Sequence, residues 1–111
     1  MNDQISFAAQ VYPENMAEIF QKGFKSVINN RPDLEGGAEQ PTSAVLEEAA
    51  RNAGIDYVFQ PVVAAQITQL DIEAFARHYT ELPKPILMFC RSGSRSSNLY
   101  QTAKQMDLLN D

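Results

Sequence analysis

The sequence contains one cysteine, one histidine and no tryptophan among its 111 residues. A single cysteine cannot form an internal disulfide, so the fold is expected to hold without cross-links. One cysteine and one histidine also leave too few nitrogen and sulfur ligands for a tetrahedral metal site, and we expect neither a metal nor a cofactor. A free thiol persists most easily in a reducing compartment, which favours a cytoplasmic location.

Long apolar runs and an excess of basic residues are missing as well. The longest apolar runs are about six residues, far short of a membrane span. The amino-terminal stretch has an acid at Asp3 and no basic start before an apolar run, so no signal peptide is expected. The net charge of −5 argues against nucleic acid as a partner, because phosphate backbones need basic surface. A small anionic substrate responds to local charge and remains compatible.

The length and the 44% apolar composition fit one globular domain over residues 1–111. Strand-like and helix-like segments alternate along it. Strands are expected at residues 5–7, 24–30, 57–63 and 85–90, and helices from Pro13, Ser43, Thr68 and Ser94. This order predicts an α/β fold with a central, largely parallel sheet of four to five strands flanked by helices.

Details of the pattern place individual strands and side chains. Pro61 suggests that the third strand ends at an edge or a bend. The continuous apolar run at residues 85–90 is typical of a central strand covered on both faces. Apolar residues expected to face the core include Phe20, Val45, Phe59 and Met106.

The segment PILMFCRSGSRSS, residues 85–97, places the only cysteine between the apolar run and a cluster of small polar and basic residues. In a parallel sheet the ligand site lies at the carboxyl ends of the strands, where Cys90 ends its strand. The amides of residues 91–95 can form an anion-binding nest, and the following helix directs its positive end at the thiol. Arg91 and Arg95 add positive charge. All these effects favour thiolate over thiol, so the pKa of Cys90 is expected to lie below its ordinary value.

The loop residues have separable expected roles. Cys90 and Arg95 are the candidate catalytic residues, because a planar guanidinium matches a tetrahedral oxyanion. Gly93 allows the backbone of a tight loop to approach the anion closely. Ser96 can donate a hydrogen bond to the thiolate. The candidate anion-binding residues are Arg91, Ser92, Gly93, Ser94, Ser96 and Arg31.

Arg31 follows the second strand and is therefore expected at the same sheet edge as Cys90. It can contact substrate there. The alternative is a solvated turn in which Arg31 pairs with Asp33.

Three segments, FKSVINNRPDLEG, YVFQPVVAAQIT and PILMFCRSGSRS, resemble in order and spacing the bacterial family called beta-lactamase hydrolase-like protein, phosphatase-like domain. The resemblance covers the chain from about Ile5 to Met106, and it implies a fold similar to that of dual-specificity protein phosphatases. It also implies that Cys90 is a nucleophile, that Arg95 binds the oxyanion and that the loop between them cradles the anion.

The sequence departs from those phosphatases in two ways. Four residues separate Cys90 from Arg95, one fewer than in the phosphatase signature. The stretch 60–68, which corresponds to the loop carrying the general acid in phosphatases, has no acidic residue. Candidate replacements for that acid are Asp33, Glu35 and Asp71.

The shorter loop is similar to that of rhodanese sulfurtransferases, which carry sulfur as a cysteine persulfide and need no separate general acid. Three functions therefore stay open. The first is a cysteine-dependent phosphatase, the second a sulfurtransferase forming a Cys90 persulfide, and the third an anion-binding or redox-sensing module without turnover. The expected partner is a small anion, either a phosphate ester or a sulfane sulfur donor.

Overall fold

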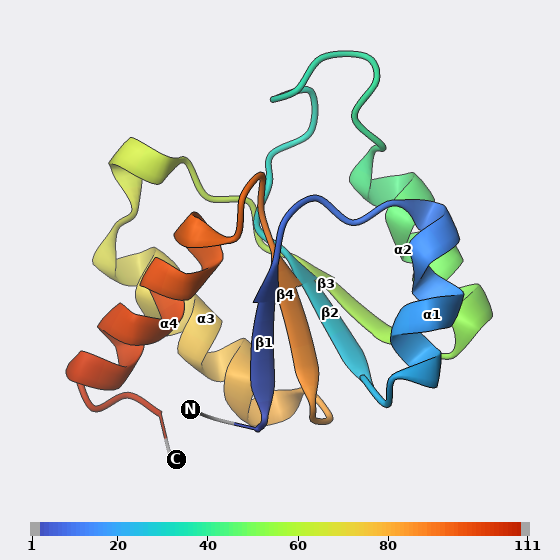
Figure 1. Ribbon diagram of the computed structural model, residues 1–111. Coiled ribbons are helices and arrows are strands. Elements are labelled where there is room, and N and C mark those ends of the chain that lie inside the picture. Colours follow the sequence, from blue (N-terminus) through green and yellow to red (C-terminus); the bar gives the residue numbers. More distant parts are fainter. Residues whose placement is uncertain (1–2, 110–111) are drawn as a thin grey trace.

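The computed structural model describes residues 3–109. Its centre is a parallel sheet of four strands in the order β1-β4-β2-β3 (Figure 1). The strands are β1 Ile5–Ala8, β2 Ser26–Asn29, β3 Asp56–Phe59 and β4 Ile86–Phe89. The helices are α1 Met16–Gln21, α2 Ser43–Ala53, α3 Gln69–Glu81 and α4 Ser94–Gln105, with short 3-10 turns η1 Pro13–Asn15 and η2 Ala64–Gln66. The predicted fold class is confirmed.

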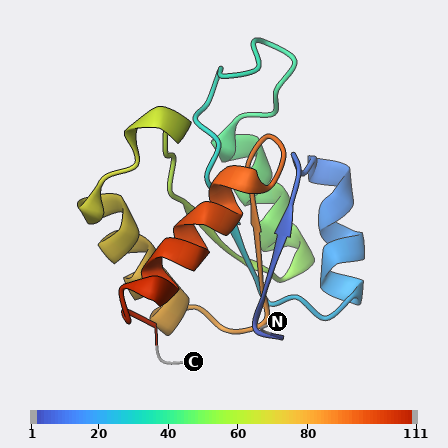
Figure 2. The ribbon, with the colours of Figure 1, turned by 60° about the vertical axis from the view of Figure 1, so that its left-hand side comes forward.

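Strand β4 is central because all four of its side chains are apolar and both sheet faces are covered. It pairs with β1 on one side and β2 on the other, and its four residues are all buried. Alternate residues point to opposite faces. Ile86 and Met88 enter the core beneath α3 and α4, whereas Leu87 and Phe89 enter the core beneath α1 and α2. Figure 2 shows the two helix layers enclosing the sheet.

Local signals end and begin the helices where the sequence predicts. Thr68 Oγ1 accepts from the amide of Asp71, and the Asp71 carboxylate accepts from the amide of Thr68, forming a reciprocal capping box at the start of α3. Gly54 ends α2 in the left-handed region, with φ of +83°. Strand β3 stops before Pro61 and lies at the edge of the sheet.

Four apolar residues expected in the core are exposed: Phe20, Val45, Phe59 and Met106. Val45 stands beside the buried stripe of α2, which runs through other positions of that helix. Met106 follows the end of α4 and so leaves its buried side. Phe59 belongs to the edge strand, and the ring of Phe20 lies beside Gly54. Periodicity alone identifies an apolar stripe but does not set its width.

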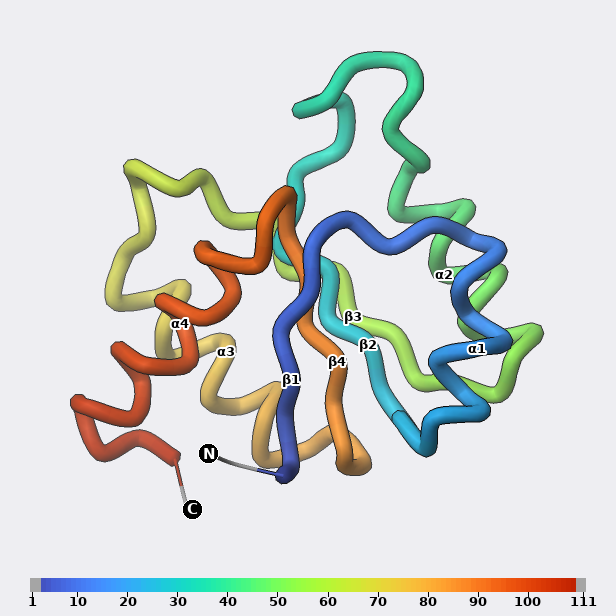
Figure 3. Tube along the Cα trace, in the orientation of Figure 1, coloured from blue at the N-terminus to red at the C-terminus, as the bar shows by residue number. Residues whose placement is uncertain are grey.

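Three of the loops that follow the carboxyl ends of the strands lie together at the top of Figures 1 and 3. They comprise residues 30–42 after β2, residues 60–68 after β3 and residues 90–93 after β4. The first projects farthest from the sheet (Figure 3). Within residues 3–109, no helix is both long and apolar enough to cross a membrane.

Candidate anion-binding site

Cys90 lies at the base of the loop between β4 and α4. The strand ends at Phe89, one residue earlier than predicted, and the Cys90 amide donates to Ala8 O of β1 at 3.3 Å. The residue is 1% exposed. The amide of Gly93 donates to Cys90 Sγ at 3.0 Å. Gly93 adopts φ of +95°, which favours glycine, and a Cβ there would lie 3.4 Å from the Ala8 carbonyl.

The surroundings of the sulfur favour its ionised form. Burial by itself would raise the pKa of the Cys90 thiol. Hydrogen bonds from the backbone amides of Ser96, Ser92 and Gly93, and from the Ser96 hydroxyl, outweigh burial and bring the pKa below the ordinary value. The direction agrees with the sequence-based expectation. The contributing amides differ from the predicted set of residues 91–95, because the amides of Ser92 and Gly93 act together with that of Ser96 in the first turn of α4.

Ser96 also contacts the neighbouring strand. Its fully buried hydroxyl donates to Asn30 Oδ1 at 2.7 Å, and Asn30 Nδ2 donates in turn to Gln60 O at 2.9 Å. The hydroxyl carries one proton, so a thiolate at Cys90 competes with Asn30 for it. Asn30 thereby holds Ser96 beside the sulfur.

A pocket of about 180 Å³ opens over the thiol. The residues that line it are Ala64, Ile67, Cys90, Arg91, Ser92, Ser94, Arg95 and Asn98. It therefore combines the loop after β4 with the loop after β3, and it contains five of the predicted site residues. None of these lining residues is acidic. Arg91 is exposed at the rim, and the Ser92 hydroxyl donates to Ser94 Oγ at 3.3 Å.

The guanidinium group of Arg95 is held through Nη1 and Nη2 but not through Nε. Its Nη1 donates to Glu35 Oε2 at 3.0 Å and to Val62 O at 2.9 Å, and its Nη2 donates to Glu35 Oε1 at 3.2 Å. Its side chain is 11% exposed, and the buried Nε has no hydrogen-bond partner within residues 3–109. The Nε–H and the second Nη2–H lie on the same edge of the guanidinium plane, so both unpartnered donors point in the same direction.

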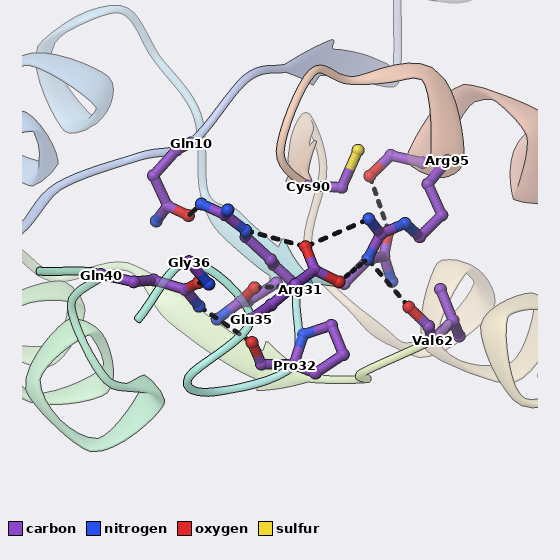
Figure 4. A network of polar contacts seen from close by, with 12 residues as sticks. Gln10, Arg31, Pro32, Glu35, Gly36, Gln40, Val62, Cys90 and Arg95 are labelled. Atoms are coloured by element: carbon purple, nitrogen blue, oxygen red, sulfur yellow. Dashed lines mark hydrogen bonds and ion pairs between the residues drawn. The ribbon is translucent and has the colours of Figure 1, made fainter. Parts of the chain in front are cut away.

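Arg31 lies beside Arg95 but does not line the pocket. Its Nε donates to Glu35 Oε1 at 2.9 Å, and its Nη1 donates to Gln10 Oε1 at 2.9 Å (Figure 4). The alternative in which Arg31 pairs with Asp33 is wrong, because Arg31 pairs with Glu35. Asp33 Oδ1 accepts from the amide of Ser43 at 2.8 Å, because the loop turns that carboxylate to the start of α2.

None of the three proposed replacement acids lines the pocket. Asp33 is engaged at α2 as described, and Asp71 Oδ2 accepts from the amide of Thr68 at 2.9 Å within the capping box. Burial alone would raise the pKa of Glu35, but hydrogen bonds and charge from Arg95 and Arg31 bring it below the ordinary value. Glu35 is thus a stable anion and a poor proton donor.

Among the contacts that sequence reasoning missed, those of Glu35 and Asn30 lie nearest to the predicted site residues Arg95 and Ser96. The sequence presents Glu35 as a candidate proton donor, although arginines at positions 31 and 95 are also natural partners for its carboxylate. Arg31 and Glu35 are four positions apart, so their pairing could be inferred from the local sequence. Arg95 is distant in the chain, so its pairing with Glu35 could not. Asn30 ends a predicted strand at the sheet edge that holds the site, and that placement was the available signal.

No three histidine, cysteine or acidic side chains come together as metal ligands within the described part of the chain, residues 3–109. The polar groups of the site are amides, hydroxyls and guanidinium groups, which bind anions. The arrangement therefore places an ionisable thiol at the base of a pocket whose polar groups suit an anion.

The parallel sheet flanked by helices is a phosphatase-like α/β fold. The chain belongs to the family described as "Beta-lactamase hydrolase-like protein, phosphatase-like domain", which it matches over residues 1–106. The predicted family is confirmed. A beta-lactamase hydrolase-like protein of Agrobacterium fabrum is 36% identical over 107 residues, which cover 96% of this chain and 25% of that protein. The chain thus spans about a quarter of the length of this curated relative.

Two solved structures extend the comparison. A candidate phosphatase from Neisseria meningitidis is 30% identical with a TM-score of 0.88, covering 96% of this chain and 75% of that one. A variant of TpbA from P. aeruginosa, solved in complex with pTyr, is 16% identical with a TM-score of 0.67, covering 95% of this chain and 62% of that one. The second likeness concerns the fold alone.

Proposed function

We propose that this domain hydrolyses phosphate monoesters through a covalent intermediate on Cys90, with Arg95 and the loop amides binding the transferred group. One observation carries the proposal: a buried thiol of lowered pKa lies at the base of a pocket lined by Arg95, whose Nε has no hydrogen-bond partner among residues 3–109. Membership of a phosphatase-like family supports the same reaction class. The pTyr bound to TpbA, a protein of similar fold, illustrates the substrate type.

The reaction has two steps. The Cys90 thiolate attacks phosphorus, an S–P bond forms, and the bond from phosphorus to the ester oxygen breaks, leaving its electron pair on that oxygen. Water then attacks the phosphocysteine, the S–P bond breaks, and phosphate leaves while the thiolate is regenerated. Donors aimed at the equatorial oxygens stabilise both transition states, and amides of the loop together with Arg95 provide them.

The lack of an acidic residue in the pocket limits the substrate class. A positioned general acid typically contributes about 10²–10⁴-fold to rate by protonating the leaving group. The lining residues contain no carboxyl group, and Glu35 remains ionised. We therefore assign substrates whose leaving group needs no proton, such as aryl phosphates, in preference to alkyl phosphates.

A second candidate, transfer of sulfane sulfur, is supported by the same lack of an acid together with the short loop. Only four residues separate Cys90 from Arg95. The thiolate would attack the outer sulfur of thiosulfate, the S–S bond would break, and sulfite would leave with its electron pair. Cyanide would then take the terminal sulfur from the Cys90 persulfide as thiocyanate and regenerate the thiolate.

Turnover of a graded series of aryl phosphates, run beside thiosulfate with cyanide, separates these reactions. Cys90→Ser and Arg95→Lys are the controls in both arms. We expect cysteine-dependent phosphate release whose rate falls steeply as the leaving-group pKa rises. Cysteine-dependent thiocyanate without phosphate release would replace the first candidate with the second. No cysteine-dependent turnover in either arm would overturn both and leave a binding module.

A further inference from the structure

Glu35 lies between the two arginines at the sheet edge, outside the pocket that covers Cys90. Its Oε2 accepts from Arg95 Nη1, and its Oε1 accepts from both Arg95 Nη2 and Arg31 Nε (Figure 4). The Glu35 side chain is 28% exposed, whereas both guanidinium-bearing side chains are 11% exposed. Contacts of this number and burial exceed those of an ordinary surface ion pair.

The contacts of Arg95 divide its guanidinium group into a used edge and a free edge. Glu35 and the Val62 carbonyl take both protons of Nη1 and one proton of Nη2. The remaining donors, Nε–H and the second Nη2–H, are parallel and spaced for two-point binding of an oxyanion. Nε is buried without a partner among residues 3–109. In Figure 4 this edge is turned to the side of Arg95 on which Cys90 lies.

The loop that carries Glu35 is braced against displacement. The amide of Gly36 donates to Gln40 Oε1 at 2.6 Å, and Gln40 Nε2 donates to Pro32 O at 2.9 Å. Arg31 supplies a third support, because it binds Glu35 and is itself bound by Gln10. The carboxylate is thus presented to Arg95 by a closed turn.

The negative charge of Glu35 does not prevent an anionic substrate from binding to Arg95. Arg31 and Arg95 contribute two positive charges and Glu35 one negative charge, so the three groups together keep a net charge of one positive. The carboxylate also binds the end of the guanidinium group, away from the free edge. A bound anion and Glu35 can therefore occupy Arg95 at the same time.

We propose that Glu35 is the positioning residue of the anion site, holding Arg95 end-on so that its Nε–Nη2 edge stays directed to an oxyanion bound at Cys90. The inference rests on the proposed function, in which Arg95 binds the transferred group. It assigns Glu35 a role distinct from proton donation. Misplacement of a binding group by about 1 Å costs up to about 100-fold in rate.

The test measures how well inorganic phosphate protects Cys90 from iodoacetamide, together with kcat and KM for an aryl phosphate. Glu35→Gln keeps the size of the side chain but removes its charge. We expect protection by phosphate to weaken about 10- to 100-fold. The pH midpoint of alkylation should stay unchanged, because the amides that stabilise the thiolate do not contact Glu35. If Glu35 had only a structural role, its replacement would not weaken phosphate protection while leaving the pH midpoint of alkylation unchanged.

Three further variants make the outcome decisive. Glu47→Gln, which removes the carboxylate paired with Arg51 at 2.9 Å on α2, is the matched control and should behave as wild type. Arg95→Lys should weaken protection, and adding Glu35→Gln to it should cause little further loss. Glu35→Asp keeps the charge but shortens the reach, and it replaces Glu35→Gln if that variant does not fold.

The outcomes separate the two proposals. Phosphate protection unchanged by Arg95→Lys would overturn the proposed anion-binding role of Arg95. Protection lost in Arg95→Lys but kept in Glu35→Gln and Glu35→Asp would overturn the role of Glu35 alone. Tighter phosphate binding in Glu35→Gln would also overturn it, because Glu35 would then act as a competing anion.

Discussion

Replacing Gly93 with alanine tests two properties of the loop together, its backbone conformation and its stabilisation of the Cys90 thiolate. Gly93 has φ of +95°, and its amide donates to Cys90 Sγ at 3.0 Å. Holding an ordinary L-residue in this region costs about 1–2 kcal/mol. Alanine also reduces the conformational freedom of the unfolded chain, which returns about 0.4–1 kcal/mol. The net loss of unfolding free energy should be about 1 kcal/mol.

Contact with the neighbouring strand adds to this cost. The new Cβ would lie 3.4 Å from the carbonyl of Ala8, at the short limit of ordinary contact. Gly23→Ala provides a matched control, because Gly23 has φ of +98° with no atom within 4 Å of its Cβ position. Both variants should lower Tm by roughly 4 °C, with Gly93→Ala at least as destabilised as the control.

Only the Gly93 variant should change the thiol. Relaxation of the loop away from Ala8 moves the amide from Sγ, so the pKa of Cys90 rises and alkylation by iodoacetamide needs a higher pH. The assay is the alkylation rate from pH 5 to 10, with urea unfolding measured on the same samples. Equal destabilisation of both variants with an unchanged alkylation profile at Gly93 would refute the assigned role of its amide.

Three other predictions concern single contacts. Ser96→Ala should cost about 1–3 kcal/mol in unfolding free energy, because Asn30 Oδ1 loses its buried donor, and should also raise the pH midpoint of alkylation; an unchanged midpoint would exclude the hydroxyl from the thiolate environment. Thr68→Ala should cost about 1 kcal/mol through loss of the α3 cap while leaving alkylation of Cys90 as in wild type, and a changed profile would contradict the separation of cap and site. The stability difference between wild type and Cys90→Ser should grow as pH rises through the lowered pKa of Cys90 and level off above the unfolded value near 9, since ionisation favours the folded state there; a difference that shrinks with rising pH would mean that the folded pKa is raised.

The local sequence was sufficient to predict the helices and strands and most of the loop between β4 and α4. The side chains of the apolar run that forms β4 are buried only if both faces of the sheet are covered, and the structure places this strand between two others. Cys90 and the amides that stabilise it lie within seven consecutive residues, 90–96. A contiguous loop between a strand and a helix has few possible geometries, so the closeness of its amides to the thiol could be predicted from residue types and spacing.

Residue types alone did not determine which carboxylate meets which arginine. Arg31 has acidic neighbours at positions 33 and 35, and the choice of Glu35 depends on a turn closed by Gln40. The pairing of Glu35 with Arg95 spans 60 positions and exists only because β2 and β4 are neighbours.

The sequence by itself therefore determined the alternating elements, the central strand and the position of Cys90 in the loop between β4 and α4. These depend on short-range periodicity, capping and turn chemistry, which act over a few residues. Only the tertiary structure decided that Glu35 and Val62 hold Arg95 with one edge free. A hydrogen bond between residues that are distant in the sequence needs a short distance and a suitable angle. Both depend on how strands and loops are placed in space, which no local pattern encodes.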